Sequence, residues 1–228
     1  MTARTPAAIR DEEALRTLLG EPSGLVRAKV VDRLNDLTRQ WVDRSPFVLL
    51  ATSSPDGACD VSPRGDPPGF VRVLDERTLL LPERPGNRLA DSLRNVLANP
   101  HVGLLFVIPG ICDTLRVNGR ATLVTDEELL APCAVEGKVP KLGILVDVEQ
   151  VFTHCSKAFM RAELWDSSRH ADRSDLRRRA RSTEASTRRS TPARTTRSEP
   201  TATRGAKAST RRRRCRSRSS PPSPSSRP

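Results

Sequence analysis

The segment DVSPRGDPPGFVRVLDERTLLLPERPGNR, residues 60–88, carries more information about the fold than any other part of the chain. Two short loops, SPRG at 62–65 and PERPGNR at 82–88, enclose apolar runs at 69–74 and 78–81. Apolar runs bounded by Pro and Gly are typical of β-strands. A helical pattern begins near Leu89, so the segment predicts two strands followed by a loop and a helix.

The second of these loops has the composition of an anion-binding site. Arg84, Asn87 and Arg88 stand just before the predicted helix. Free backbone N–H groups at a helix start, together with guanidinium groups, are a common way to bind phosphate. The alternative is that Pro and Gly only mark turns and that the arginines are solvated. The two loops taken together favour a phosphate site.

The formal net charge of +12 comes from the C-terminal tail. Residues 171–228 contain 18 Lys and Arg against 4 Asp and Glu, which leaves 21 basic and 23 acidic residues in 1–170. The first 170 residues therefore have the composition of an ordinary globular domain. After Leu176 the chain has no Leu, Ile, Val, Met or aromatic residue. Because burial cannot offset the entropy of ordering such a segment, we expect a disordered tail.

Three explanations account for this tail. Arg, Ser, Pro, Thr and Ala are the residues that GC-rich coding DNA yields when it is translated out of frame, and we favour this explanation. The second is a genuine disordered extension. The third is a nucleic-acid-binding arm, but the tail has no aromatic side chain on which bases could stack.

Several other functions are disfavoured. Residues 1–16 lack the apolar core of a signal peptide, and no apolar run approaches the ~18 residues of a membrane span, so we expect a cytoplasmic protein. The five cysteines are odd in number and form no C-x-x-C pair, which indicates reduced thiols. The three histidines are too scattered for a metal cluster, and we expect no metal site.

Hydrophobic periodicity predicts a mainly β fold. The Pro55-Asp56-Gly57 turn between two apolar runs predicts a hairpin. The expected strands cover residues 47–53, 58–62, 69–74, 78–81, 101–107, 113–125 and 141–152. The expected helices cover residues 11–19, 29–43, 87–98, 126–130 and 156–164. The second helix would bury Val30, Leu34, Leu37 and Trp41, and the third would bury Leu89, Leu93, Val96 and Leu97.

Six or seven antiparallel strands with few helices between them favour a β-barrel with flanking helices. We expect an N-terminal helical segment at 1–45, the barrel at 46–170 and the tail at 171–228. On the strand 113–125, Arg116, Asn118 and Arg120 alternate and share one face. Such a polar row either faces solvent or lines a cavity or a subunit interface. His154 and Cys155 are neighbours that point to opposite faces of a strand, which disfavours nucleophilic catalysis.

An ordered series of motifs carries a family resemblance: FxxLAT at 47–52, DVSPRGDPPGF at 60–70, RPGNR at 84–88, TLRVNGRA at 114–121 and HCxKA at 154–158. The series resembles the pyridoxamine 5′-phosphate oxidase-like family, in its FMN-dependent, split-barrel subgroup, over roughly residues 10–170. The resemblance implies a homodimer with FMN at the interface. It also implies cofactor-binding roles for Ser62, Pro63 and Arg64 along the flavin, for Arg84, Asn87 and Arg88 at the phosphate, and for Arg116, Lys157 and Trp165 in the interfacial pocket.

The function implied by the resemblance is an FMN-binding oxidoreductase whose substrate and electron donor are unknown. The dimerisation and substrate-binding segment at the C-terminus of pyridoxamine phosphate oxidase itself has no counterpart here, which disfavours that reaction. One alternative is a reductase that uses the deazaflavin F420. The other is a non-catalytic flavin- or haem-binding protein. No residue stands out as a catalytic acid or base.

Overall fold

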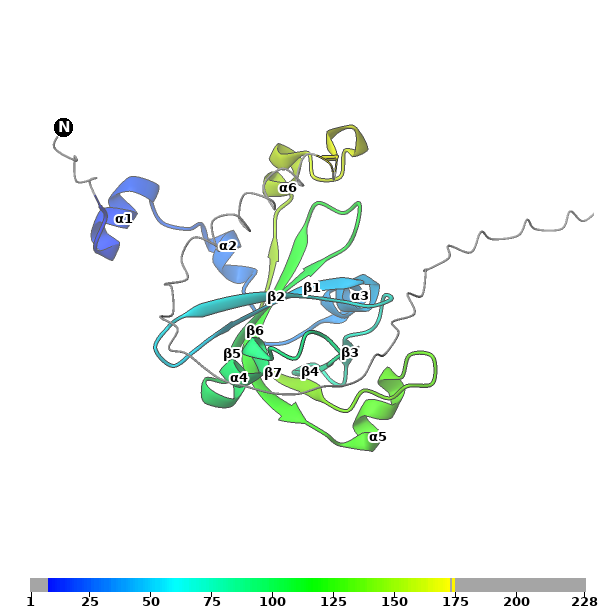
Figure 1. The fold of residues 1–228 in the computed structure, drawn as a ribbon. Helices are drawn as coiled ribbons and strands as arrows, with labels where there is room; N and C mark the ends of the chain where they lie inside the picture. The colour runs from blue at the N-terminus through cyan, green and yellow to red at the C-terminus, as the bar shows by residue number, and fades with distance from the viewer. Residues whose placement is uncertain (1–7, 173, 175–228) are drawn as a thin grey trace, which may run out of the picture. The chain divides into compact units, whose positions relative to one another are not determined.

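Seven strands form one antiparallel sheet in a computed structural model that describes residues 8–172 and residue 174 (Figure 1). The order of strands across the sheet is β2-β1-β5-β6-β7-β4-β3. The strands are β1 (Phe47–Ser53), β2 (Cys59–Gly65), β3 (Arg72–Val73), β4 (Thr78–Pro82), β5 (His101–Val107), β6 (Thr114–Val124) and β7 (Gly143–His154). Within the described residues, β2 and β3 are the two ends of the sheet. The seven antiparallel strands confirm the predicted mainly β, antiparallel split barrel.

Short helices flank the sheet. They are α1 (Glu12–Leu19), α2 (Gly24–Ala28), α3 (Asp36–Arg44), α4 (Asp91–Ala98), α5 (Glu127–Leu130) and α6 (Lys157–Ala162), with 3-10 turns η1 (Ala131–Cys133) and η2 (Ser167–Arg169). The helix α4 packs against β1 and β6. The helix α5 lies in the connection from β6 to β7, whereas α6 follows β7 and lies at the other end of these strands (Figure 1).

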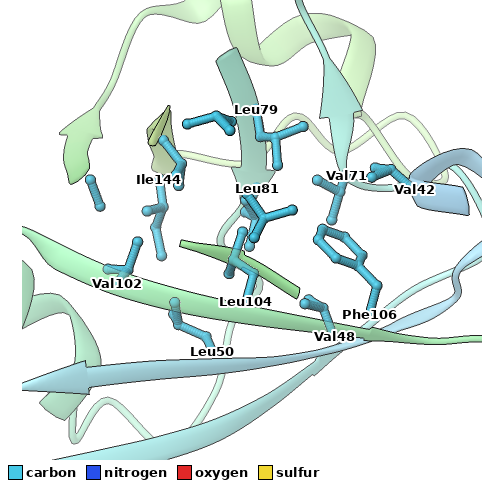
Figure 2. Close-up of a cluster of buried hydrophobic side chains, with 14 of the residues drawn as sticks. Val42, Val48, Leu50, Val71, Leu79, Leu81, Val102, Leu104, Phe106 and Ile144 are labelled. Carbon is cyan, nitrogen blue, oxygen red and sulfur yellow. The ribbon is translucent and has the colours of Figure 1, made fainter. Parts of the chain in front are cut away.

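The core is built by alternate residues of the strands. Val48 and Leu50 of β1 stand opposite Phe106 and Leu104 of β5, and all four are buried. Successive side chains of a strand point to opposite faces, so one face of β1 and one face of β5 are apolar. Figure 2 shows these side chains pointing toward Leu81 of β4 and its neighbours from β7 and α3.

The predicted helix at 29–43 is wrong in its first half. The helix α3 begins only at Asp36, because Asn35 and Thr38 form a capping box in which each side chain accepts a hydrogen bond from the other residue's backbone N–H. Thr38 and Val42 are the buried residues of α3, whereas Val30 and Leu37 are exposed. Leu34 is buried as predicted, but residues 29–35 are not helical, so the predicted apolar stripe does not continue through them.

The predicted helix at 87–98 also begins too early. Arg88 and Ala90 have φ values of 64° and 58°, in the left-handed region, which is incompatible with a continuous right-handed helix. The helix α4 therefore starts at Asp91, and Leu89 and Leu97 are 61% and 75% exposed rather than buried. Val96 is buried, as predicted.

Two strands show the largest differences from the predicted bounds. The strand expected at 69–74 is reduced to Arg72–Val73, and the strand expected at 58–62 extends to Gly65. The tail predicted at 171–228 lies outside the described residues, apart from 171, 172 and 174. The boundary expected near residue 45 stays a prediction. Among the described residues, no helix has both the length and the apolar character needed to cross a membrane.

Candidate functional site

A cavity of about 650 Å³ opens where β2, the loop after β4 and the start of α4 meet. It lies between the two ends of the sheet, because β2 is one end strand and β4 lies next to the other. Six of the nine predicted site residues line it, namely Ser62, Pro63, Arg64, Arg84, Asn87 and Arg88. Their roles toward a cofactor stay predictions.

The strand β2 presents polar side chains to this cavity. Asp60, Ser62 and Arg64 pair with Thr52, Leu50 and Val48 of β1, which point into the core, so the three β2 side chains share the inward face. All three are half-buried, whereas the β2 residues between them are exposed. The inward face of β2 is therefore polar where the inward face of β1 is largely apolar.

Ser92 joins this strand to α4. Its side chain is buried, and its hydroxyl donates a hydrogen bond of 2.8 Å to Asp60 Oδ2. The same hydroxyl lies 3.0 Å from Ser62 Oγ. These contacts fix the first turn of α4 against the inward face of β2.

Two ion pairs span the cavity between β2 and the loop at 83–88. Arg64 pairs with Glu83, and its Nε also donates to Ser62 Oγ at 3.2 Å. Arg84 Nε donates to Asp66 Oδ2 at 2.5 Å, and its Nη2 donates to the Cys133 carbonyl at 2.9 Å. Both arginines therefore already have acceptors within the protein.

The start of α4 has the features of an anion site. Its N-cap residue, Ala90, offers no side-chain hydrogen bond, so first-turn N–H groups lack the usual side-chain acceptor. Asn87 Oδ1 accepts a hydrogen bond of 2.9 Å from the Leu89 N–H, which holds the loop just before the helix. Arg88 is exposed and has no ion pair or side-chain hydrogen bond with any other described residue. A positive charge therefore lies beside a helix start that has no side-chain cap.

The other three predicted residues do not line this cavity. Arg116 lies on the opposite face of β6 from the core, where its Nη2 donates to Gln150 Oε1 at 2.9 Å and its guanidinium lies 5.2 Å from the Phe152 ring centroid. Its Nε is buried without a hydrogen-bond partner. Lys157 is exposed at the start of α6. Trp165 Nε1 donates to the Ile111 carbonyl at 3.0 Å.

Four residues that make the polar contacts described above had no role in the sequence prediction: Asp60, Asp66, Glu83 and Ser92. Asp66 and Glu83 do have a sequence signal, since each stands within two residues of a predicted site arginine. Ser92 has none, because its contact with β2 depends on the tertiary structure. Within the described residues, no group of three or more His, Cys, Asp or Glu could hold a metal ion. The four cysteines in that part of the chain are free.

The chain matches one protein-family model and is similar to several solved structures. The family model of pyridoxamine 5′-phosphate oxidase matches residues 34–155. No curated protein matches the chain by sequence. Among similar solved structures, HupZ of Group A Streptococcus is 17% identical, with 53% of this chain and 93% of that chain covered and a TM-score of 0.42.

Two further solved structures are similar. General stress protein 26 of Bacillus anthracis is 14% identical over 50% of this chain and 88% of that chain, with a TM-score of 0.39. An FMN-binding protein of Syntrophomonas wolfei is 10% identical over 63% of this chain and 97% of that chain, with a TM-score of 0.41. Because the family model covers more than half of the sequence, in agreement with the motifs and the fold, this chain belongs to the pyridoxamine 5′-phosphate oxidase family.

Proposed function

We propose that the chain is a flavoprotein that binds FMN in the cavity between β2 and α4 and acts as an oxidoreductase. The observation that carries the proposal is the uncapped start of α4 next to Arg88, inside a cavity of ligand size. A helix N-terminus and a guanidinium group together suit a phosphate dianion. The volume of about 650 Å³ lies within the range of about 300–1,000 Å³ that is usual for ligand sites.

The residues of the cavity fit the two ends of such a ligand. The phosphate would lie at Arg88 and the first turn of α4, and the ring system would lie along Ser62, Pro63 and Arg64 of β2. When bound, a flavin supplies the electron-transfer chemistry, and the protein supplies orientation and hydrogen bonds. The described lining residues with ionisable side chains are Asp, Glu and Arg only. The chain's own contribution would therefore be binding and orientation rather than proton transfer by His, Cys or Lys.

The test is to identify the small molecule that purifies with the protein. Denaturing the purified full chain and measuring the absorbance spectrum and mass of the released compound should give FMN. A deazaflavin such as F420 would support the alternative reductase, and haem would support a haem-binding protein. Protein that purifies without a chromophore and does not bind added FMN would contradict the proposal.

The same proposal includes a homodimer. Arg116 Nε, buried without a partner, marks the outer face of β6 as a surface with an unsatisfied polar atom. Lys157 and Trp165 lie far along the chain from the cavity-lining segments, and a second subunit could bring them to a flavin. Sedimentation equilibrium of the full chain should give twice the mass of 25.1 kDa. A monomer that binds FMN stoichiometrically would refute the dimer and leave the flavin site intact.

A further inference from the structure

We infer that the cavity assigns different tasks to its three arginines: Arg64 and Arg84 are positioning residues that fasten the loop 83–88 to β2, and Arg88 supplies the charge that binds the ligand's phosphate. This inference rests on the proposed FMN site, because it specifies which side chains of that site contact the phosphate.

The two ion pairs have opposite orientations: the arginine lies on the β2 side in one pair and on the loop side in the other. On the β2 side the order is positive then negative, at Arg64 and Asp66, whereas on the loop side it is negative then positive, at Glu83 and Arg84. Each side contributes one arginine and one carboxylate, so a shift of the loop along β2 would place like charges against each other. We name these four residues the clasp.

The clasp connects two regions of the described chain between which the sheet has no strand pairing. The sheet leaves β2 and β3 as its ends within the described residues, and both ion pairs connect the β2 end with the loop that follows β4. The four side chains are between 17% and 27% exposed, so solvent screens them less than surface ion pairs. This connection positions Asn87 and Arg88, which stand in the loop just before the first residue of α4.

The clasp arginines are poorly placed to serve as the main phosphate ligands. Each has two guanidinium nitrogens already engaged, Arg64 with Glu83 and Ser62 and Arg84 with Asp66 and the Cys133 carbonyl. Moving either arginine to a dianion would leave a half-buried carboxylate unpaired beside that dianion, which is unfavourable. A phosphate would gain less from these neutralised pairs than from an unpaired cation.

Arg88 meets the opposite conditions. It is exposed and has no ionic partner among the described residues, and it stands two residues before the uncapped N-cap of α4. Its left-handed backbone, like that of Ala90, is a strained conformation that non-glycine residues seldom adopt. Such strained residues cluster at binding sites, where the surrounding structure holds them in place.

Comparing FMN with riboflavin separates the two tasks, since these ligands differ only in the phosphate. The dissociation constants of both are measured on the ligand-free full chain by quenching of flavin fluorescence, and melting temperatures are measured without ligand. Arg88→Ala should lower the preference for FMN over riboflavin about 10- to 100-fold, the loss expected for a charge-assisted hydrogen bond. Its melting temperature should be unchanged. Arg44→Ala, which removes an exposed arginine of α3 outside the cavity, is the matched control and should change neither quantity.

Arg84→Gln should behave differently. The ligand-free protein should melt at a lower temperature, and at a temperature where the variant is folded its affinities for FMN and riboflavin should fall by the same factor. A purely structural role for Arg84 would leave both affinities unchanged. Asp66→Asn, a milder variant, should weaken the clasp while freeing Arg84, so that the preference for FMN stays the same or increases.

The outcomes that overturn the inference are distinct from those that overturn the proposed function. If Arg84→Gln lowers the preference for FMN as much as Arg88→Ala does and melts like the wild type, Arg84 is a phosphate ligand and the inference is wrong. If the wild type binds neither flavin, the proposed function fails and the phosphate role of Arg88 fails with it. In that case the melting temperatures still decide the clasp, because unchanged melting of both Arg84→Gln and Asp66→Asn would refute it.

Discussion

Replacing Gly119 with alanine should strongly destabilise the protein, because β6 and β7 approach each other too closely there for a side chain. The register between these strands shifts between Asn118 and Gly119. A Cβ atom added at Gly119 would lie 2.1 Å from the carbonyl oxygen of Asp147, whereas ordinary van der Waals contact begins at 3.4 Å. The obstacle is backbone, so no change of rotamer can relieve the overlap.

The cost follows from what must move. To gain the missing 1.3 Å (3.4 Å less 2.1 Å), β7 has to shift away from β6 at Asp147. This shift disrupts the pairing of Gly119 with Val148 and of Arg120 with Asp147. Two lost backbone hydrogen bonds at about 1 kcal/mol each, plus about 1–3 kcal/mol for overpacking, give a loss of about 3–5 kcal/mol. A loss of this size is a large part of the ~5–15 kcal/mol that stabilises a typical domain.

The assay is urea-induced unfolding followed by far-UV circular dichroism, at equal protein concentration so that any association cancels. Gly103→Ala is the matched control in the neighbouring strand, where the added Cβ would lie 3.4 Å from Asn118 Oδ1 and 3.7 Å from the Ala51 Cβ. The control should change the free energy of unfolding by less than about 1 kcal/mol, since alanine restricts the unfolded chain and fits the folded one. If Gly119→Ala is as stable as Gly103→Ala, the close approach of β6 and β7 is not as described.

Three further variants test other parts of the chain. Ser92→Ala should lose about 1–3 kcal/mol of unfolding free energy in urea, because the half-buried Asp60 carboxylate loses its hydroxyl donor; an unchanged midpoint would show that α4 does not depend on this contact. Burial and the nearby Arg116 guanidinium lower the pKa of His154 below its ordinary 6.5, so its contribution to stability is present above that pH and is lost as the pH falls through the lower folded value. His154→Gln should therefore flatten the fall in melting temperature as the pH drops below 6.5, whereas an identical pH profile would contradict this assignment. Deleting residues 176–228 should leave the melting temperature and flavin content unchanged and reduce salt-sensitive adsorption to nucleic acid, since that segment lacks apolar side chains to bury; a marked loss of stability would show that the tail packs on the domain.

The strands were predictable because their signal is local. In β1 and β5, alternate residues are buried along the whole strand, and the predicted bounds agree with the observed ones. Helix ends were less predictable, since backbone conformations outside regular periodicity decide them. Nothing in the apolar spacing around Leu89 distinguishes a helix that starts at Asn87 from one that starts at Asp91. The left-handed conformations of Arg88 and Ala90 make that difference.

The candidate site was predictable in its basic residues and not in their partners. The composition of the loop at 82–88 indicated an anion site, and the structure places its arginines around one cavity. The pairing of Arg84 with Asp66 joins residues from the two ends of the sheet. Since nothing local in the sequence states which strands are the ends, neither the pairing nor the position of Ser92 could be predicted.

The opening of the sheet and the polar cavity are best understood as one feature. A closed barrel would pair the edge of β2 with another strand and would fill its interior with side chains. Here the inward face of β2 is polar, whereas the inward face of its neighbour β1 is largely apolar. Asp60 and Ser62 bond to Ser92 of α4, and Arg64 pairs with Glu83 in the loop before α4, rather than with groups in the core. Half-buried polar groups of this kind need complete sets of hydrogen bonds, which fixes the loop and α4 at a defined separation from β2. The same interactions that connect the two ends of the sheet therefore also keep the cavity of about 650 Å³ open between them.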